Sequence, residues 1–507
     1  MIEDGYRVAA PDFAAFEKAY TEGQPQLVWR RFAGDLDTPV SAYLKLTGKR
    51  KDTFLLESVE GGDQLGRYSF IGLKPDLIWR ARGDSAEINR HPATDSDHFE
   101  PEDLGTIASL HRVLEESAIR LDAETESRLP PMAAGMFGYF GYDFVRLTEH
   151  LPHRKPAPFD VPDGYFVRPT LIAIFDNVKR EVVVVTPVRP DSGISARAAY
   201  GRASERLADA IDDLRRPVAE PILPDHKEPE FTAHTPRGVY AEMVAKAKDY
   251  IAAGDIFQVV LAQRFSAPYE GDPFAVYRAV RRVNPSPFLF YLNFRPVTLM
   301  GASPEILVRV REGDVTIRPI AGTRPRGRTK AEDLAYEQDL LADPKERAEH
   351  LMLLDLGRND VGRASEIGTV TPTETFSIER YSHVMHIVSN VTGRLREGLR
   401  PVDALAAGFP AGTLTGAPKV RAMEIIDELE SEGRGPYGGC IGYFGADGGI
   451  DTCIGLRMAI LKDGEIHVTA GAGIVADSDP AAEQRECEMK AKAMMEAVRI
   501  AARTSGQ

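Results

Sequence analysis

The sequence predicts an α+β protein in which large antiparallel sheets are flanked by helices. Helical and strand-like segments alternate irregularly, without the regular βαβ rhythm of a doubly wound parallel sheet. A seven-residue segment also occurs twice, as GMFGYFG at Gly135–Gly141 and as GCIGYFG at Gly439–Gly445. Each copy lies in the later portion of its half of the chain, which favours duplicated αβ units. The glycines of such strands allow another backbone to approach closely.

Length, composition and charge are those of a globular, net acidic protein. The chain has 507 residues, of which 43% are hydrophobic and 27% charged, and this excludes disordered, collagen-like and coiled-coil proteins. One compact core is not expected at this length, whereas two large lobes are. The formal net charge of −14 argues against nucleic acid or an anionic membrane as the main partner. A local basic pocket for a small anion remains compatible with it.

A proline-rich segment, Arg215–Pro236, divides the chain. It contains five prolines and several charges, and it shows no sustained apolar period, as expected of a linker. We therefore predict an N-terminal region at residues 1–215, a linker at 216–236 and a C-terminal region at 237–507.

Local patterns predict the elements on either side of the linker. Apolar residues recur at spacings of four, four and three from Val239 to Tyr250, which predicts a helix, and Gly254 is typical of the stop that follows one. The other predicted elements are a helix at 107–121 and strands at 171–175, 181–186 and 256–265.

Cysteine usage and the chain start indicate a reducing compartment. Cys440, Cys453 and Cys487 are too few for a disulfide framework, and their spacing matches no zinc motif. The first twenty residues lack the basic-then-apolar order of a signal peptide, and no apolar run is long enough to span a bilayer. We expect a soluble, cytoplasmic protein.

Two helices are predicted to begin in the same way and to carry the same acidic pair. Asp343-Pro344 and Asp479-Pro480 each combine an N-cap with a proline in the first helical position. Two glutamates three residues apart follow in each helix and share one face. These pairs are Glu346 with Glu349 and Glu483 with Glu486.

The acidic pairs allow two interpretations from the residues alone. Glutamates in a first turn are favoured by capping and by the helix dipole, so each pair can be purely structural. If the two helices face each other, however, four carboxylates converge and need a cation to offset their repulsion. All-oxygen ligation then indicates Mg²⁺, which also takes oxygens of an anionic substrate.

Glycine-rich segments and basic residues suggest an anion site. We expect turns at Gly412–Lys419, ahead of a helix that begins at Pro418, and at Gly471–Gly473, and backbone N–H groups at such turns can hold an anion. Neither segment is a nucleotide-binding motif, and each alone is also compatible with a simple turn. The candidate carboxylate partners are Arg324, Arg457 and Lys490.

A single histidine, His386, lies in the apolar run Val384–Val388. Such a histidine can be a structural core residue or a catalytic one. No nucleophile-elbow motif occurs, so a Ser-His-Asp arrangement has no support.

Taken together, these segments resemble the chorismate-utilising enzymes, and among them the large subunits, component I, of anthranilate synthases. The resemblance covers nearly all of residues 240–500 in the family's order. The motifs that carry it are Gly254–Phe265, Gly301–Glu305, Pro319–Arg324, Glu349–Asp355, His386–Ser389, Phe409–Thr413, Gly471–Gly473 and Glu483–Lys490, with Leu55–Ser58 and Gly66–Ser69 in the N-terminal region.

The resemblance implies the chorismate-binding fold and the conversion of chorismate and ammonia to anthranilate and pyruvate, the first committed step of L-tryptophan biosynthesis. It places Mg²⁺ on Glu349 and Glu486, supported by Glu346 and Glu483. Glu305 is implied as the acid for the leaving hydroxyl and His386 as the residue that assists pyruvate loss. Thr413 is implied as a third catalytic residue. The implied substrate-binding residues are Gly322, Thr323, Tyr437, Arg457, Gly471, Ala472, Gly473 and Lys490.

Two positions distinguish this chain from relatives with other chemistry. Water-adding members of the family have a lysine at the position of Gln258, and a glutamine cannot activate water as a base. Aminodeoxychorismate synthases typically have a nucleophilic lysine at the position of Ala321. Both differences favour direct attack of ammonia at C2 of chorismate.

The resemblance also implies partners and regulation. The chain contains no recognisable glutaminase module, so we expect a separate glutamine amidotransferase subunit in a heterotetramer. Feedback inhibition by L-tryptophan is implied through Ser58 and the segment Asn284–Leu289, which includes Pro287, Phe288 and Leu289. The family often has Tyr-Met at the last two positions, and the change keeps apolar bulk. The same residues can also simply pack the two halves together.

Two alternatives remain open at this point. One is aminodeoxychorismate synthase component I of the folate branch. The other is a tryptophan-binding regulatory protein without catalysis.

Overall fold

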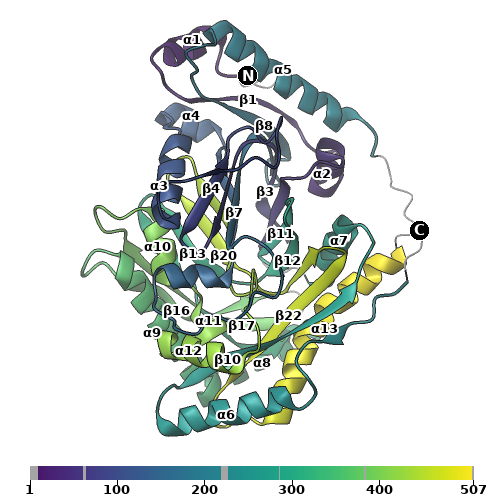
Figure 1. Cartoon of the computed structure of the whole chain (residues 1–507), viewed down its shortest axis with the longest axis vertical. Helices are drawn as coiled ribbons and strands as arrows, with labels where there is room; N and C mark the ends of the chain where they lie inside the picture. Colours follow the sequence, from purple (N-terminus) through teal and green to yellow (C-terminus); the bar gives the residue numbers. More distant parts are fainter. Residues whose placement is uncertain (1–8, 61–63, 219–226, 285, 382–383, 505–507) are drawn as a thin grey trace.

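The computed structural model describes residues 9–60, 64–218, 227–284, 286–381 and 384–504, and it confirms the predicted α+β class (Figure 1). Within these residues, twenty-two strands form one hydrogen-bonded network in which every pairing is antiparallel. Two long runs of strands share the pair β3 and β7, and we call these runs the first and the second sheet.

The first sheet joins strands from both halves of the chain. Its order is β1 (Gln26–Ala33), β8 (Glu181–Val188), β7 (Gly164–Asp176), β3 (Gln64–Arg82), β2 (Thr53–Glu60), β11 (Phe288–Asn293), β12 (Thr298–Ser303), β21 (Met458–Lys462), β22 (Glu465–Ile474) and β10 (Gln258–Pro268), with β9 (Thr232–Ala233) and β18 (Gly416–Ala417) on β10.

The second sheet uses the other ends of β3 and β7. Its order is β5 (Glu100–Pro101), β4 (Ser85–Asn89), β3, β7, β6 (Gly135–Phe140), β19 (Cys440–Gly445), β20 (Ile450–Ile454), β13 (Ile306–Arg311), β14 (Asp314–Ile317) and β17 (Val384–Arg394), with β15 (Ile320–Pro325) and β16 (Thr371–Arg380) also on β17.

Helices cover the outer faces of both sheets. Those on the first sheet are α1 (Phe13–Thr21), α2 (Pro39–Thr47), α5 (Ala196–Arg215), α6 (Val239–Ala253), α7 (Pro273–Val283) and α13 (Pro480–Thr504). Those on the second are α3 (Thr106–Ser117), α9 (Pro344–Ala364) and α10 (Pro401–Gly408). Two further helices, α11 (Gly412–Thr415) and α12 (Lys419–Leu429), lie against β10 of the first sheet, and α12 contributes buried side chains to the cores under both helical layers. The remaining helices are α4 (Ala123–Arg128), α8 (Lys330–Ala342) and the 3-10 helix η1 (Tyr142–Leu147).

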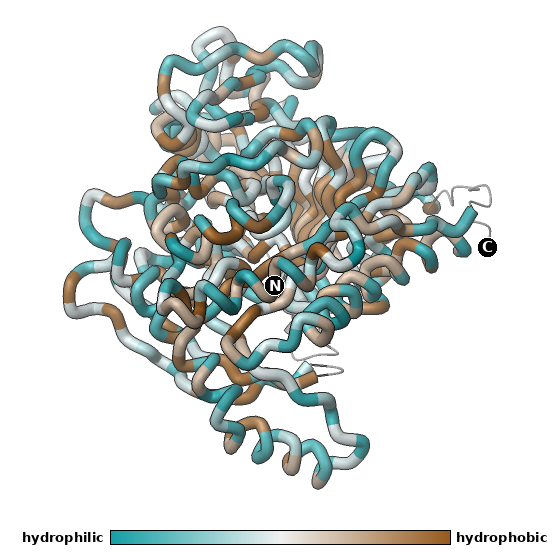
Figure 2. Tube along the Cα trace, turned by 60° about the horizontal axis from the view of Figure 1, so that its bottom comes forward, coloured by the Kyte–Doolittle hydropathy of each residue, from teal (hydrophilic) through white to brown (hydrophobic). Residues whose placement is uncertain are grey.

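Strand alternation assigns each side chain to one of three cores. On β11, Leu289 and Tyr291 pack under the helices of the first sheet, whereas Phe290 faces a core shared with the second sheet. On β19, Tyr443 faces the same shared core and Phe444 packs under the helices of the second sheet. The period of two thus produces a sandwich of two sheets inside two helical layers. Figure 2 shows the hydrophobic strands gathered inside the more polar outer helices.

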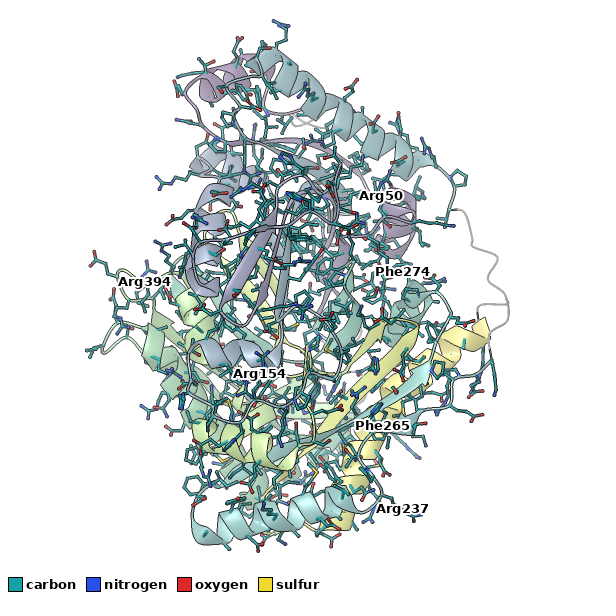
Figure 3. The ribbon with its side chains drawn as sticks, viewed as in Figure 1. Arg50, Arg154, Arg237, Phe265, Phe274 and Arg394 are labelled. Carbon is teal, nitrogen blue, oxygen red and sulfur yellow. The ribbon has the colours of Figure 1, made fainter. Side chains whose placement is uncertain are left out.

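Labelled side chains follow the same layering. Phe274 of α7 is buried in the helical layer of the first sheet, whereas Arg237 and Arg394 project from the periphery (Figure 3). Among the described residues, no helix combines the length and apolar composition that a membrane crossing requires.

The repeated glycine segment has a structural explanation. Its two copies are the neighbouring strands β6 and β19, which pair so that Gly138 lies opposite Gly442. A Cβ atom at Gly138 would overlap the carbonyl oxygen of Tyr165, and one at Gly442 would overlap that of Asp451. The glycines are therefore needed for close packing of strands at the junction of the two halves.

Most predicted elements are confirmed. The helix at 239–250 is α6 and ends at Gly254, whose φ of 84° favours glycine. The other predicted helix and strands correspond to α3, β7, β8 and β10, and all three cysteines are free and buried. The boundary at 216–236 remains a prediction: residues 1–8 and 219–226 lie outside the described residues, while β2–β11 and β6–β19 join strands from both sides of it.

Two predicted turns are wrong. The segment Gly412–Lys419 contains the short helix α11 and the strand β18, and α12 begins at Lys419. Gly471–Gly473 is not a turn but the interior of β22, where Gly471 lies opposite Ala262 and Gly473 opposite Val260. A Cβ at Gly473 would lie 2.7 Å from Nε2 of Gln258. Glycine is required here for close approach, and the sequence pattern does not distinguish this need from a turn.

Candidate active site

Glu305 is a buried carboxylic acid between β12 and β13. Its side chain accepts a hydrogen bond at Oε2 from Oγ1 of Thr413, which lies in α11, over 3.1 Å. Burial raises the pKa of Glu305 to about 8, although the Thr413 hydrogen bond and the charge of Arg457 both lower it. Because the desolvation of the carboxylate dominates, Glu305 is protonated at neutral pH and can donate a proton.

His386 is held in one tautomer by the strand opposite it. The β15–β17 register places His386 across from Thr323, and the pairing shifts at Gly322, where φ is 70°. His386 Nδ1 lies 2.9 Å from the carbonyl oxygen of Gly322 and 3.1 Å from Oγ1 of Thr323. Nδ1–H donates to that carbonyl, so Nε2 keeps its lone pair. Burial lowers the pKa of His386, which is therefore a neutral base.

Arg457 links the acid to the base. It lies between β20 and β21 with φ 48°, a left-handed conformation that is uncommon for a residue with a side chain. Its charge lowers the pKa of both Glu305 and His386, so the guanidinium is within electrostatic range of both. Thr413, Glu305, Arg457 and His386 thus form one constellation.

The predicted carboxylate pair of α9 is present and anchored. Asp343 caps the helix by accepting from the backbone N–H groups of Lys345 and Glu346. Glu346 then accepts a hydrogen bond from Arg324 at 3.1 Å. Arg324 also pairs with Asp339 and Asp343, so this arginine is engaged by protein carboxylates and orients Glu346.

The second pair faces the first from α13. Burial raises the pKa of half-buried Glu349, and the negative charges of Glu346 and Glu486 raise it further, while Lys345 and Lys490 lower it. Residues of α9 and α13 are thus close enough to interact. Glu486 pairs with Lys490 at 2.7 Å, and Lys490 Nζ also donates to the carbonyl of Gly471 at 3.2 Å. Glu483 lies one turn earlier on the same helix.

These glutamates form a set of oxygen donors that suits Mg²⁺. Carboxylate oxygens are the ligands this ion prefers, and a divalent cation would relieve the repulsion that raises the pKa of Glu349. No three of the four glutamates bring ligand atoms within 4.8 Å of one another among the described residues. Mg²⁺ usually keeps water or substrate oxygens among its ligands.

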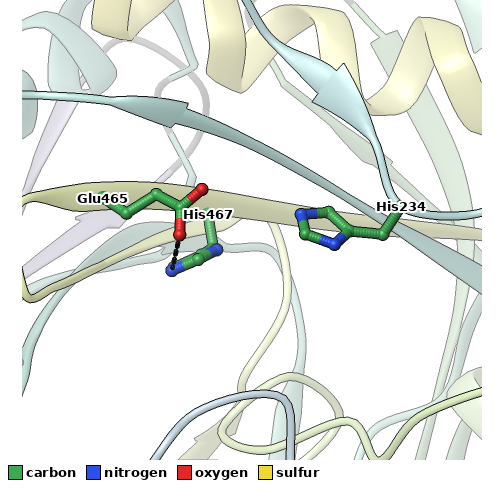
Figure 4. A group of neighbouring side chains, drawn as sticks. All are labelled: His234, Glu465 and His467. Atoms are coloured by element: carbon green, nitrogen blue, oxygen red, sulfur yellow. Dashed lines mark ion pairs between the residues drawn. The ribbon is translucent and has the colours of Figure 1, made fainter.

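A different group, His234, Glu465 and His467, does bring its ligand atoms within 4.8 Å (Figure 4). Arg264, however, donates to Nδ1 of His467 at 2.9 Å and to Nδ1 of His234 at 3.1 Å. Both neutral imidazoles must then carry their proton on Nε2, and Arg264 places a positive charge beside them. This tautomer leaves neither ring a lone pair for a metal, and the group serves to tie β9 to β10 and β22.

The remaining predicted substrate residues lie on one strand and in one loop. Gly471, Ala472 and Gly473 lie on β22, and Tyr437 is buried in the loop after α12. The backbone N–H of Tyr437 donates to the carbonyl of Arg434 at 3.2 Å. The predicted residues therefore come from elements distributed through both sheets and from three helices.

A separate cavity of about 300 Å³ lies at the predicted effector residues. Ser58 of β2 and Phe288 of β11 are directly opposite in register, and both line it together with Leu289. Arg309, Arg311 and Asp451 supply charged groups to its wall. Pro287 is not among the lining residues, and Pro285 of the same segment lies outside the described residues.

Two contacts were not foreseen from the sequence. Tyr381 meets His386 edge-on with ring centroids 5.6 Å apart, and Arg434 contacts several site-bearing segments at once. Tyr381 lies five residues before His386, a spacing that carries no motif. Arg434 divides its hydrogen bonds between the Glu430 carboxylate and the carbonyls of Leu414 and Val260, and backbone carbonyls leave no mark in a sequence.

Comparisons with known proteins identify the family of the chain. The family model of the chorismate binding enzymes matches residues 74–496. Anthranilate synthase component 1 of Cereibacter sphaeroides is 55% identical over 489 residues, covering 96% of this chain and 97% of that protein. The chain belongs to the chorismate-binding enzyme family. Anthranilate synthase component 1 of Pseudomonas aeruginosa is 48% identical over 474 residues, covering 92% of this chain and 94% of that protein.

Solved structures place the chain in the same part of the family. Anthranilate synthase component I from Streptococcus pneumoniae TIGR4 has a TM-score of 0.75 and 36% identity, covering 91% of this chain and 98% of that one. The menaquinone-specific isochorismate synthase of Escherichia coli shares the fold with a TM-score of 0.68 at 17% identity, covering 96% and 99%. The predicted resemblance is confirmed, and the chain is an enzyme of this chorismate-binding family.

The elevated pKa of Glu305 predicts a pH-dependent effect on stability. An unfolded glutamate ionises near 4.5, whereas Glu305 in the folded chain ionises at about 8. The contribution of Glu305 to the free energy of unfolding therefore falls as pH rises from 4.5 to 8, and it stays constant above that. Glu305→Gln removes this loss. The melting temperature of the variant minus that of the unaltered chain should therefore increase as pH rises through this window.

Exposed Glu397→Gln controls for the change in net charge. If the melting temperature of Glu305→Gln runs parallel to that of the unaltered chain from pH 4.5 to 8, Glu305 does not have the assigned pKa.

Proposed function

We propose that this enzyme converts chorismate and ammonia into anthranilate and pyruvate, the first committed step of L-tryptophan biosynthesis. Ammonia comes from a separate glutamine amidotransferase subunit, Mg²⁺ is required, and L-tryptophan inhibits by feedback. The observation that carries the proposal is a protonated acid, Glu305, and a neutral base, His386, which both feel the charge of Arg457. The relatives named anthranilate synthase component 1 support the same reaction.

The acid serves the first step. Ammonia forms a bond to C2 while the C4–O bond breaks, and hydroxide is too poor a leaving group to depart unaided. Glu305 donates its proton to this oxygen, which leaves as water, and the surplus proton of the new ammonium group passes to solvent. The Thr413 hydroxyl, 3.1 Å from Oε2, directs the carboxyl group.

The base serves the second step. Removal of the proton at C2 forms the last double bond of the aromatic ring while the C3–O bond breaks. The side chain leaves as enolpyruvate, which takes up a proton to become pyruvate. His386 Nε2 is the free lone pair for this task because Nδ1–H is committed to the Gly322 carbonyl. Arg457 and Lys490 supply positive charge for the two carboxylates of the substrate.

The glutamates of α9 and α13 would hold the metal. Glu349 and Glu486 are the proposed direct ligands, with Glu346 and Glu483 in support. When bound, Mg²⁺ neutralises the ring carboxylate of chorismate and stabilises charge that develops on the ring. Arg324 keeps Glu346 in place, and Lys490 offsets the charge of Glu486 through their 2.7 Å pair.

Two neutral residues support ammonia as the direct nucleophile. Gln258 is buried on β10, and its amide cannot deprotonate a water molecule. Ala321 lies on β15 opposite Ile387 and offers no amine for covalent attack. These residues disfavour both hydration of chorismate and amination at C4.

A direct assay tests the reaction. Supplied with chorismate, Mg²⁺ and ammonium at alkaline pH, the chain should produce anthranilate, which is followed by its fluorescence, and chelation of Mg²⁺ should stop the signal. Formation of isochorismate instead would contradict the proposal. A product that becomes aromatic only after a separate lyase is added would indicate aminodeoxychorismate synthase. Stabilisation by tryptophan without any turnover would indicate a regulatory protein.

The cavity at Ser58 predicts a way to separate inhibition from catalysis. Tryptophan should inhibit the unaltered chain, and Ser58→Phe, which fills the cavity from its wall, should weaken inhibition about tenfold or more while ammonia-dependent turnover persists. Ser127→Phe on exposed α4 is the matched control and should be inhibited normally. A folded Ser58→Phe that tryptophan still inhibits fully would remove this cavity as the effector site.

A further inference from the structure

A buried ion pair, Arg434 with Glu430, lies beneath the active site. Arg434 is 5% exposed and Glu430 7% exposed. Arg434 Nε donates to Glu430 Oε2 at 3.0 Å, and Nη2 donates to Oε1 at 2.5 Å. The guanidinium also lies over the ring of Tyr142, 4.9 Å from its centroid. The reaction steps above use neither charged group.

The other donors of Arg434 reach backbone carbonyls of two distant segments. Nη1 donates to Leu414 at 2.6 Å, and Nη2 donates to Val260 at 2.8 Å. Leu414 is the neighbour of Thr413 in α11, and Val260 lies opposite Gly473 in the β10–β22 register. One planar guanidinium therefore fixes the α11 segment and strand β10 at a set distance from each other.

The main chain of Arg434 and the side chain of Glu430 add two more connections. The carbonyl of Arg434 accepts from the N–H of Tyr437 at 3.2 Å. Glu430 Oε1 accepts from the N–H of Ala262 at 2.9 Å, and Ala262 lies opposite Gly471. Arg434 and Glu430 therefore bond to the backbone of one predicted site residue, Tyr437, and to residues that are next to or paired with three others. These three are Thr413, Gly471 and Gly473.

We propose that Arg434 is a positioning residue for this reaction, which sets the spacing between the Thr413 segment, the glycine strand β22 and Tyr437. The inference rests on the proposed function. Only an arginine presents donors in a rigid planar fork, so one side chain can bond a carboxylate and two separate carbonyls together. A lysine brings the same charge to one point and cannot hold both carbonyls.

A second, partly buried arginine provides a matched comparison. Arg146, on the 3-10 helix η1, donates to carboxylates of Asp143 and Asp427 and to the carbonyl of Leu151. None of these partners is adjacent to an assigned site residue. Arg146 therefore matches Arg434 in chemistry and differs from it in what it connects.

The experiment compares Arg434→Lys, Glu430→Gln and Arg146→Lys with the unaltered chain in the anthranilate assay, with concentrations corrected for folded protein. Arg434→Lys should raise the KM for chorismate and lower kcat/KM about tenfold or more, because small displacements of binding groups cost up to about 100-fold. Arg146→Lys should lower the melting temperature and leave KM unchanged. Glu430→Gln breaks the ion pair but keeps both carbonyl contacts, so its KM should stay close to that of the unaltered chain.

A double variant covers the case in which Arg434→Lys fails to fold. Arg434→Met with Glu430→Gln leaves no buried charge and keeps an acceptor for Ala262, and it should show the same rise in KM. An unchanged KM in the Arg434 variants would overturn the inference. An equal rise in Glu430→Gln or in Arg146→Lys would overturn it too, because pairing or stability would then explain the effect. Absence of anthranilate from the unaltered chain would instead refute the proposed reaction.

Discussion

The burial of neighbouring carboxylates on two helices is the constraint around which this site is organised. Burial raises the pKa of half-buried Glu349 on α9, and the charges of Glu346 and Glu486 raise it further. The fold maintains this arrangement with an N-cap at Asp343, the Arg324 pair to Glu346 and the Lys490 pair to Glu486. Carboxylate oxygens are the ligands that Mg²⁺ prefers, and the substrate of the proposed reaction would bring further anionic groups to such an ion.

The sheet network explains how residues so far apart in sequence reach one place. Strands β6 and β19 pair at their glycines and join the two halves of the chain. Pairing with β10 places the glycine strand β22 beside α11 and α13. His386 and Thr323 meet because β15 and β17 are in that register. The tautomer of His386, the protonation of Glu305 and the anchoring of the glutamates are all consequences of backbone placement, which one arginine, Arg434, further secures.

Features fixed by local interactions were predictable from the sequence. The Asp-Pro starts of α9 and α13, the face of α6 and its stop at Gly254 all follow from neighbours within a few residues. The predicted turn at Gly471–Gly473 was wrong because glycine occurs both in turns and where strands pack closely. The function of Arg434 could not be predicted, since its partners are the carbonyls of Leu414 and Val260, far away in sequence. Arg324 was a candidate for the substrate, and its three protein carboxylates were visible only in the fold.

Calorimetric titration of Mg²⁺ into the chain, with chorismate present and ammonia absent, tests the central claim most directly. The unaltered chain should bind Mg²⁺ saturably, and Glu349→Gln and Glu486→Gln should each lose that binding. Asp355→Asn, an exposed carboxylate with 57% of its side chain accessible on the same helix as Glu349, should bind as the unaltered chain does. Equal Mg²⁺ binding by the unaltered chain and both glutamate variants would contradict the account.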